Sequence, residues 1–125
     1  MHRSKLAGFI IDCQTPDLEG AARFWGSALG LPVTGEADSD PGYRQLQNTP
    51  GELHVEVQQV EHASRVHLDI ESDDLEAEAV RLEALGAKRI SKVKRWIVME
   101  APTGQRFCIV RPQSPDFAKR ANNWK

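Results

Sequence analysis

A repeated ten-residue pattern limits the folds available to this chain more than any other feature of its sequence. Residues 10–19, IIDCQTPDLE, align with residues 67–76, HLDIESDDLE, at a constant offset of 57 positions. Four of the ten positions are identical, including the Asp12/Asp69 pair. In both copies an alternating apolar pattern leads into helical spacing, which is typical of a strand followed by a helix. The repeat therefore predicts a fold built from two similar halves.

Each copy continues into a stripe of apolar residues at helical spacing. The two stripes are Leu18, Ala21, Ala22, Trp25 and Leu29, and Leu75, Ala79, Leu82 and Leu85. These spacings predict two amphipathic helices. Thr15-Pro16 and Ser72-Asp73 suit the starts of the helices, and Gly30 and Gly86 suit their ends.

Three shorter strand-like segments follow each helix, so the order of strand, helix and three strands occurs twice. The expected segments are 32–36, 42–48 and 53–59, then 87–91, 95–100 and 105–111. Neither half is large enough to bury its helix and sheet alone, so we expect one α+β domain over residues 1–125. Its expected parts are a first module at about 5–60, a second at about 65–112 and a C-terminal tail at 113–125.

The bulk composition excludes several classes of function. With 125 residues and a net charge of −2, the chain has no electrostatic basis for binding nucleic acid or an anionic membrane surface. No apolar run approaches the roughly 20 residues that cross a membrane, and no secretory leader is recognisable. Two cysteines, Cys13 and Cys108, do not make a disulfide scaffold. We therefore expect a cytoplasmic protein with reduced thiols.

Strand alternation gathers ionisable side chains on one face of each half. In the second copy, Val66, Leu68 and Ile70 are expected to face the helix, whereas His67 and Asp69 face away from it. The same reasoning turns Asp12, His54 and Glu56 away from the first helix and places Arg106 and Cys108 on one face of the last strand. Buried charges need partners or water, so a wet ligand-binding cavity is the natural place for these groups.

Three stretches carry a resemblance to a known family. They are TPDLEGAARFWGSALGLPV, RVHLDIESDDLEAEAVRLEALGA and MEAPTGQRFCIV. The chain resembles the vicinal oxygen chelate superfamily of glyoxalases, bleomycin-resistance proteins and dioxygenases, and in particular its glyoxalase-like domain branch. The resemblance implies two βαβββ modules whose curved mixed sheets enclose one cavity. It also implies a small-molecule ligand, a homodimer and, in many members, one divalent metal ion.

The metal-ligand positions that the resemblance implies are only partly filled. They fall at Ile10, at Glu56 or His54, at His67 and at Cys108. Ile10 has no donor atom, so His67 and Glu56 are the expected ligands of any zinc, nickel, manganese or iron ion, with Cys108 as a third. Structural roles stay open as well: His67 as a hydrogen-bonded strand residue, and Asp12 and Asp69 as partners of groups where the modules meet.

These residues predict one of two functions. The first is an enzyme of lyase, isomerase or dioxygenase type that acts on a small oxygen-rich molecule. Its expected catalytic residues are His67, Asp69 and Asp12, and its expected substrate-binding residues are His54, Glu56, Trp96 and Cys108. The alternative is a metal-free protein that sequesters a small molecule or antibiotic, as bleomycin-resistance proteins do, between aromatic walls. Trp25, Trp96 and Tyr43 are candidates for those walls.

Two further segments carry weaker expectations. Residues 38–42 are expected to form a surface loop or a lid. The tail contains Phe117 and Trp124 among polar residues, and such aromatics usually need cover. We expect the tail either to fold back on the chain or to dock on a second subunit.

Overall fold

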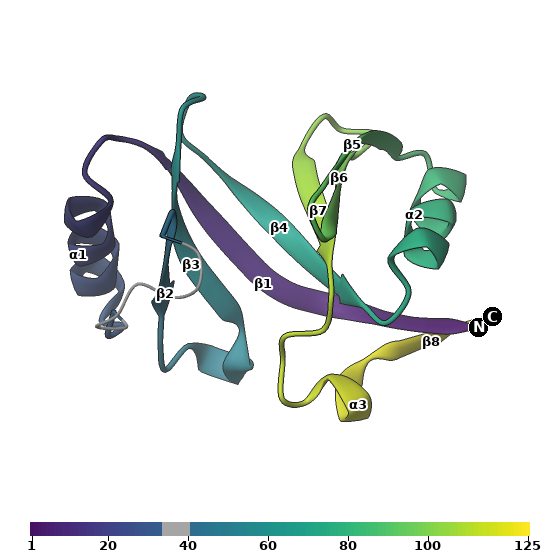
Figure 1. The fold of residues 1–125 in the computed structure, drawn as a ribbon. Coiled ribbons are helices and arrows are strands. Elements are labelled where there is room, and N and C mark those ends of the chain that lie inside the picture. Colours follow the sequence, from purple (N-terminus) through teal and green to yellow (C-terminus); the bar gives the residue numbers. More distant parts are fainter. Residues whose placement is uncertain (34–40) are drawn as a thin grey trace. The chain divides into compact units, whose positions relative to one another are not determined.

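The computed structural model describes residues 1–33 and 41–125, which form two compact units. Unit 1 comprises Met1–Gly8 and His67–Lys125, and unit 2 comprises Phe9–Val66. The long strand β1 (His2–Gln14) contributes its first residues to unit 1 and its later residues to unit 2 (Figure 1). The start of the chain is therefore grouped with the second copy of the repeat rather than with the first.

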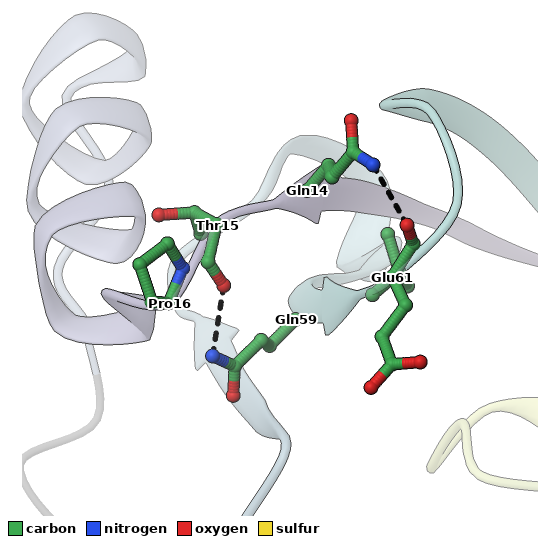
Figure 2. A pocket seen from close by; sticks show the side chains of 6 residues that line it. Gln14, Thr15, Pro16, Gln59 and Glu61 are labelled. Carbon is green, nitrogen blue, oxygen red and sulfur yellow. Dashed lines mark hydrogen bonds between the residues drawn. The ribbon is translucent and has the colours of Figure 1, made fainter.

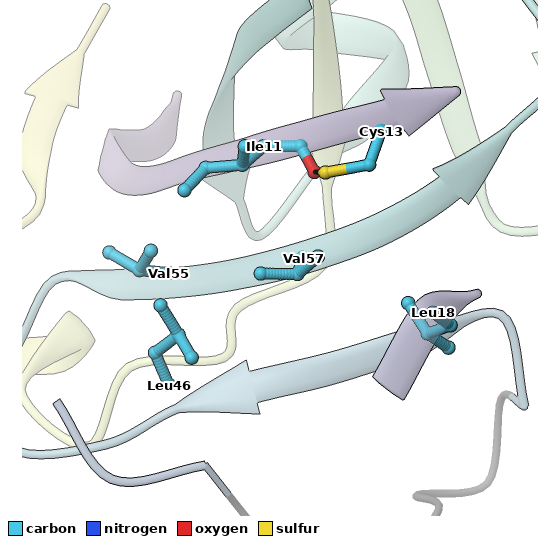
Figure 3. Close-up of a cluster of buried hydrophobic side chains, with 6 residues drawn as sticks. All are labelled: Ile11, Cys13, Leu18, Leu46, Val55 and Val57. Carbon is cyan, nitrogen blue, oxygen red and sulfur yellow. Dashed lines mark hydrogen bonds between the residues drawn. The ribbon is translucent and has the colours of Figure 1, made fainter. Parts of the chain in front are cut away.

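Unit 2 packs one helix against a small sheet. Its elements are the later part of β1, α1 (Leu18–Leu29), β2 (Tyr43–Leu46), the short 3-10 helix η1 (Pro50–Glu52) and β3 (His54–Val60). The strand order is β2-β3-β1, and β2 pairs with β3 in antiparallel register. The core contains Ile11, Cys13, Leu18, Leu46, Val55 and Val57 (Figure 3).

Unit 1 repeats this arrangement with a larger sheet. It contains β4 (Arg65–Ser72) from His67 onward, α2 (Leu75–Ala84), β5 (Lys88–Val93), β6 (Trp96–Glu100), β7 (Arg106–Val110), α3 (Phe117–Arg120) and β8 (Asn122–Trp124). The strand order is β4-β7-β6-β5, with a parallel β4–β7 pair and antiparallel neighbours beyond it. Ala79, Leu82, Ile97, Met99 and Ile109 form the core under α2.

The identical residues of the repeat begin the two helices in the same way. Asp17 and Asp74 are the N-caps, and each accepts a hydrogen bond from the backbone N–H three residues later, at 2.9 Å and 3.0 Å. Thr15 and Ser72, expected at the helix starts, instead accept the N–H of the capping aspartates. The caps satisfy donors that a helix start leaves without partners.

The predicted α+β class is confirmed, but two residues expected beneath the second helix are not covered by it. Val66 and Leu68 were expected under the second helix, yet they are 59% and 50% exposed, and only Ile70 of that set packs on the core. The reason is that α2 lies over β5, β6 and β7, whereas β4 is at the far end of this strand order. Leu85, expected in the apolar stripe, is exposed because it follows the last residue of α2.

The expected strand at 32–36 and loop at 38–42 lie mostly outside the described residues. Of these segments, Val33 forms an isolated bridge with Leu46. No helix within residues 1–33 and 41–125 is long and apolar enough to cross a membrane.

The C-terminal tail folds back on unit 1, which confirms one of its two expected arrangements. Strand β8 pairs with the start of β1, with His2 opposite Trp124. The Trp124 indole N–H donates to Ser4 Oγ at 2.8 Å, and the Arg81 guanidinium lies 3.9 Å from the centre of the indole ring. The tail therefore covers its aromatic side chain within the same unit.

Candidate functional site

Three strands of unit 1 build a row of side chains on the sheet face opposite α2. Because Ile70, Phe107 and Ile97 pack toward the helix, alternation turns their neighbours to the other face. In the strand register Asp69 lies opposite Cys108, and Cys108 lies opposite Val98 on its other side. His67 precedes Asp69 by two residues and shares its face.

His67, Asp69 and Cys108 form a compact cluster on this face. Each offers one possible metal-ligand atom, and these atoms all lie within 4.8 Å of one another. The distance from His67 Nε2 to Asp69 Oδ1 is 3.5 Å, and the two side chains are only 12% and 8% exposed. Cys108 is half-buried. The strand register thus brings together residues that are 39 positions apart in the chain (108 − 69 = 39).

The donor set of this cluster fits a divalent metal ion. Asp69 Oδ1 is buried, and apart from His67 Nε2 at 3.5 Å, which is too far for a normal hydrogen bond, it accepts no hydrogen bond in the described part of the chain. Leaving a buried carboxylate oxygen in that state is costly, and a bound cation would remove the cost. An imidazole nitrogen, a carboxylate oxygen and a thiolate sulfur are donors that zinc and similar divalent ions accept.

Two other predicted residues, His54 and Glu56, belong to unit 2. His54 Nε2 lies 2.9 Å from Glu56 Oε1, and both side chains are largely buried. Ile10, which has no donor atom, is fully buried. The cluster in unit 1 therefore contains two of the expected positions, His67 and Cys108, and adds Asp69, which we had expected to be an acid–base group.

Asp12, the repeat counterpart of Asp69, has different surroundings. It is buried, and its Oδ2 lies 3.6 Å from Nε of Arg65, whose side chain is about half exposed. An ion pair with Arg65 gives Asp12 a structural role within unit 2. The catalytic role expected for Asp12 stays a prediction.

The expected aromatic walls have different environments. Trp25 packs on the core of unit 2 and makes an edge-to-face contact with Phe24 at 5.0 Å between ring centres. Trp96 is half-buried and shares the face of Val98 and Cys108. Of these two residues, Trp96 therefore remains as a candidate substrate contact.

The two cysteines also differ. Cys13 lies in the unit 2 core, where burial raises the pKa of its thiol despite a hydrogen bond with Trp25. A raised pKa keeps the thiol protonated and unreactive, as expected for a core cysteine. Cys108, in contrast, belongs to the cluster with His67 and Asp69.

Sequence reasoning missed two arrangements in unit 1. Arg106 Nε lies 3.3 Å from Glu100 Oε1, on the same face as Cys108. His2 is hydrogen-bonded to the fully buried Glu78 at 2.7 Å. The sequence did contain a signal for the buried Glu78, because this residue interrupts the apolar stripe of its helix.

Unit 2 also has an open hollow, about 600 Å³ in volume, at the end of β1 and β3 (Figure 2). Its lining residues are Gln14, Thr15, Pro16, Gln59, Val60 and Glu61. The amides of Gln14 and Gln59 donate to backbone oxygens of Glu61 and Thr15, at 2.7 Å and 2.8 Å. These bonds tie the strand ends together, and none of the predicted site residues lines the hollow.

Two helix-on-sheet units that share one repeat, with possible metal ligands on the sheet face opposite the helix, define the class of glyoxalase-like proteins. The chain belongs to the glyoxalase-like domain family, whose model matches residues 8–110, and thus to the vicinal oxygen chelate superfamily that its motifs resemble. A search of curated proteins finds no match.

Solved structures share the fold at low sequence identity. Methylmalonyl-CoA epimerase from Mycobacterium tuberculosis is 18% identical, with 90% of each chain covered and a TM-score of 0.59. A mutant 4-hydroxymandelate synthase from Streptomyces coelicolor is 13% identical, with 90% of this chain and 50% of that chain covered and a TM-score of 0.58. A hypothetical protein from Bacillus halodurans is 16% identical, with coverages of 89% and 97% and a TM-score of 0.55. At these identities the likeness shows the fold alone.

Proposed function

We propose that the protein is an enzyme of lyase, isomerase or dioxygenase type that acts on a small oxygen-rich organic molecule. Its proposed centre is the cluster of His67, Asp69 and Cys108, with one bound divalent ion. The observation that carries this proposal is that three different ligand atoms, one of them a buried carboxylate oxygen, lie within 4.8 Å of one another. An epimerase and a synthase share the fold, so the fold does not choose the reaction.

The chain's own residues divide the work at this centre. His67 Nε2, Cys108 Sγ and Asp69 Oδ1 are the proposed ligands, and an ion bound there would act as a Lewis acid toward adjacent substrate oxygens. Asp69 Oδ2 is left to accept a proton from the substrate. The half-buried Trp96, on the same sheet face, is proposed to contact the substrate. The substrate-binding roles expected for His54 and Glu56, and the homodimer, stay predictions.

Metal analysis of protein purified without chelator tests the proposal. We expect close to one zinc, nickel, manganese or iron ion per chain. After removal of the metal, cobalt(II) should bind and give the visible absorption of a cobalt–thiolate bond. Because Cys108 and Cys13 are the only cysteines, loss of that band in Cys108→Ser assigns the sulfur ligand.

Two histidine variants provide the matched comparison. His67→Ala should weaken cobalt binding by more than about 100-fold, since even loss of a group that only orients a ligand costs 10–100-fold. His62→Ala removes an exposed histidine of unit 2 and should leave metal binding unchanged. A protein that takes up no metal, yet binds small molecules without converting them, would overturn the proposal and support the sequestering alternative.

A further inference from the structure

We propose that Arg106 selects acidic substrates, by binding a carboxylate at one end of a molecule whose other end occupies the His67/Asp69/Cys108 cluster. This inference rests on the proposed function and gives it a substrate class. The class is the small dicarboxylic acids that carry a 2-oxo or 2-hydroxy group, in which two or three carbons separate the oxygen pair from the second carboxylate.

The position of Arg106 on β7 places a cation close to the cluster. It precedes Cys108 by two residues on β7, so the two side chains leave the same face of the sheet about 6.6 Å apart along the strand. Its side chain is 36% exposed, which allows a ligand to reach it. A cationic group therefore lies one side-chain row away from Cys108 and Asp69, two of the proposed metal ligands.

The hydrogen bonding of Arg106 leaves its terminal nitrogens available to a ligand. Glu100 lies opposite Arg106 in the β6–β7 register, and its Oε1 is 3.3 Å from Arg106 Nε. No other partner of Arg106 occurs among the described residues, so the Glu100 contact orients the guanidinium without occupying its two terminal nitrogens. Those nitrogens form a planar fork that matches a carboxylate.

Other arginines of unit 1 are engaged differently. Arg81 gives both Nε and Nη2 to the carboxylate of Glu78, at 2.9 Å and 2.8 Å. Arg89 bridges two carboxylates, those of Glu76 and Glu83. Arg106 thus differs from both in keeping its terminal nitrogens available beside the cluster.

A side chain on the neighbouring strand β6 indicates what kind of group joins the two ends of the ligand. Val98 lies opposite Cys108 and two residues before Glu100, so its half-buried side chain is on the same face, next to Cys108 and adjacent to the Arg106–Glu100 row. An apolar side chain there suits methylene carbons better than a further charged group. This favours a short carbon chain between the oxygen pair and the distal carboxylate.

The alternative is that Arg106 and Glu100 form a cross-strand ion pair with a structural role only. It predicts that the protein has no preference for acidic ligands. The test uses cobalt-loaded protein and two probes of equal length, 2-oxoglutarate and 2-oxopentanoate, which differ only in a terminal carboxylate or methyl group. Calorimetric titration measures the dissociation constant of each probe.

We expect 2-oxoglutarate to bind at least about tenfold more tightly than 2-oxopentanoate, as one charge-assisted bidentate contact warrants. Arg106→Gln should abolish the preference and leave 2-oxopentanoate binding unchanged. Lys92→Gln, which removes a cation from β5 at a position opposite Ile97, should retain the preference. Glu100→Gln should strengthen 2-oxoglutarate binding several-fold, because the amide oxygen still orients Arg106 without competing for it.

The outcomes separate this inference from the proposed function. Failure of cobalt to bind, or to show the thiolate band, overturns the metal centre itself. Normal cobalt binding with equal or undetectable binding of the two probes overturns only the role of Arg106. If Arg106→Gln does not fold, the wild-type preference and the Glu100→Gln variant still decide the matter.

Discussion

The two copies of the repeat begin alike and differ in what they bury. Asp17 and Asp74 cap their helices with nearly identical geometry. Fifty-seven positions apart, however, the buried Ile10 of unit 2 corresponds to His67 of unit 1, and Ala21 of α1 corresponds to Glu78 of α2. Both units bury ionisable groups on the sheet face opposite the helix, such as Asp12 in unit 2 and Asp69 in unit 1, but unit 1 also has the fully buried Glu78 on its helix.

Glu78 is the centre of the buried polar network in unit 1. Its carboxylate receives hydrogen bonds from His2 at 2.7 Å, Ser4 at 2.9 Å and Arg81 at 2.8 Å and 2.9 Å. Burial alone would raise the pKa of Glu78, but the hydrogen bonds from Arg81, His2 and Ser4, with the charge of Arg81, lower it overall. A duplicated backbone can thus keep its helix starts while one copy acquires charges that the other lacks.

The largest expected effect is that of Glu78→Ala, which removes the feature that most distinguishes the units. Removing one partner of a buried ion pair leaves the others uncompensated, so we expect the free energy of unfolding to fall by about 3–5 kcal/mol. Urea unfolding measures the total loss in the free energy of unfolding. Amide hydrogen exchange should show that the loss of protection is concentrated in α2 rather than α1.

Glu83→Ala is the control for this change. Glu83 lies on the same helix and pairs with Arg89 at 3.2 Å, but it is exposed. Exposed ion pairs contribute little, so the expected loss is below about 1 kcal/mol. Equal losses in the two variants would mean that the buried network does not distinguish unit 1.

A smaller effect, equal in both units, is expected from removing the helix caps. Asp17→Ala and Asp74→Ala should each lower the free energy of unfolding by about 1 kcal/mol, because each leaves a backbone N–H without its acceptor. Asp17→Asn and Asp74→Asn keep an acceptor oxygen and should cost only a few tenths of that. A cap that matters in one unit alone would contradict the idea that the repeat preserves the helix start.

The smallest effect is expected from the titration of Glu78, which changes the free energy of unfolding only at acid pH. The folded pKa of Glu78 is below its unfolded value of about 4.3, so its contribution is fully present above that value. It is lost as the pH falls through the folded pKa. Urea midpoints between pH 6 and pH 3 should therefore fall more steeply in the wild type than in Glu78→Gln, and parallel curves would show that Glu78 does not titrate in this way.

Much of the fold followed from local patterns. The repeat and its apolar stripes predicted both helices, and Phe107, Ile109, Ile11 and Cys13 face the cores as alternation required. Val66 and Leu68 broke the pattern because a strand's apolar side needs a helix above it, and α2 covers other strands. Which strands a helix covers is not encoded in the strand's own alternation.

The candidate site was predicted only in part. His67 and Cys108 were expected together, but through a resemblance to a family rather than through their spacing. The pairing of Asp69 with Cys108, and of Arg106 with Glu100, depends on the register of β4, β7 and β6. Register arises from the way whole strands bury their apolar faces, so no single segment reveals it.

The sequence by itself determined the duplicated strand–helix pattern, the approximate helix starts and most of the apolar faces, because these depend on residues within about four positions of one another. Tertiary structure alone decided which ionisable groups meet, since His2 and Glu78 are 76 positions apart and only chain folding brings them to 2.7 Å. The same holds for His67, Asp69 and Cys108. Local propensity acts over a turn or a strand, whereas burial of charge requires partners from distant segments.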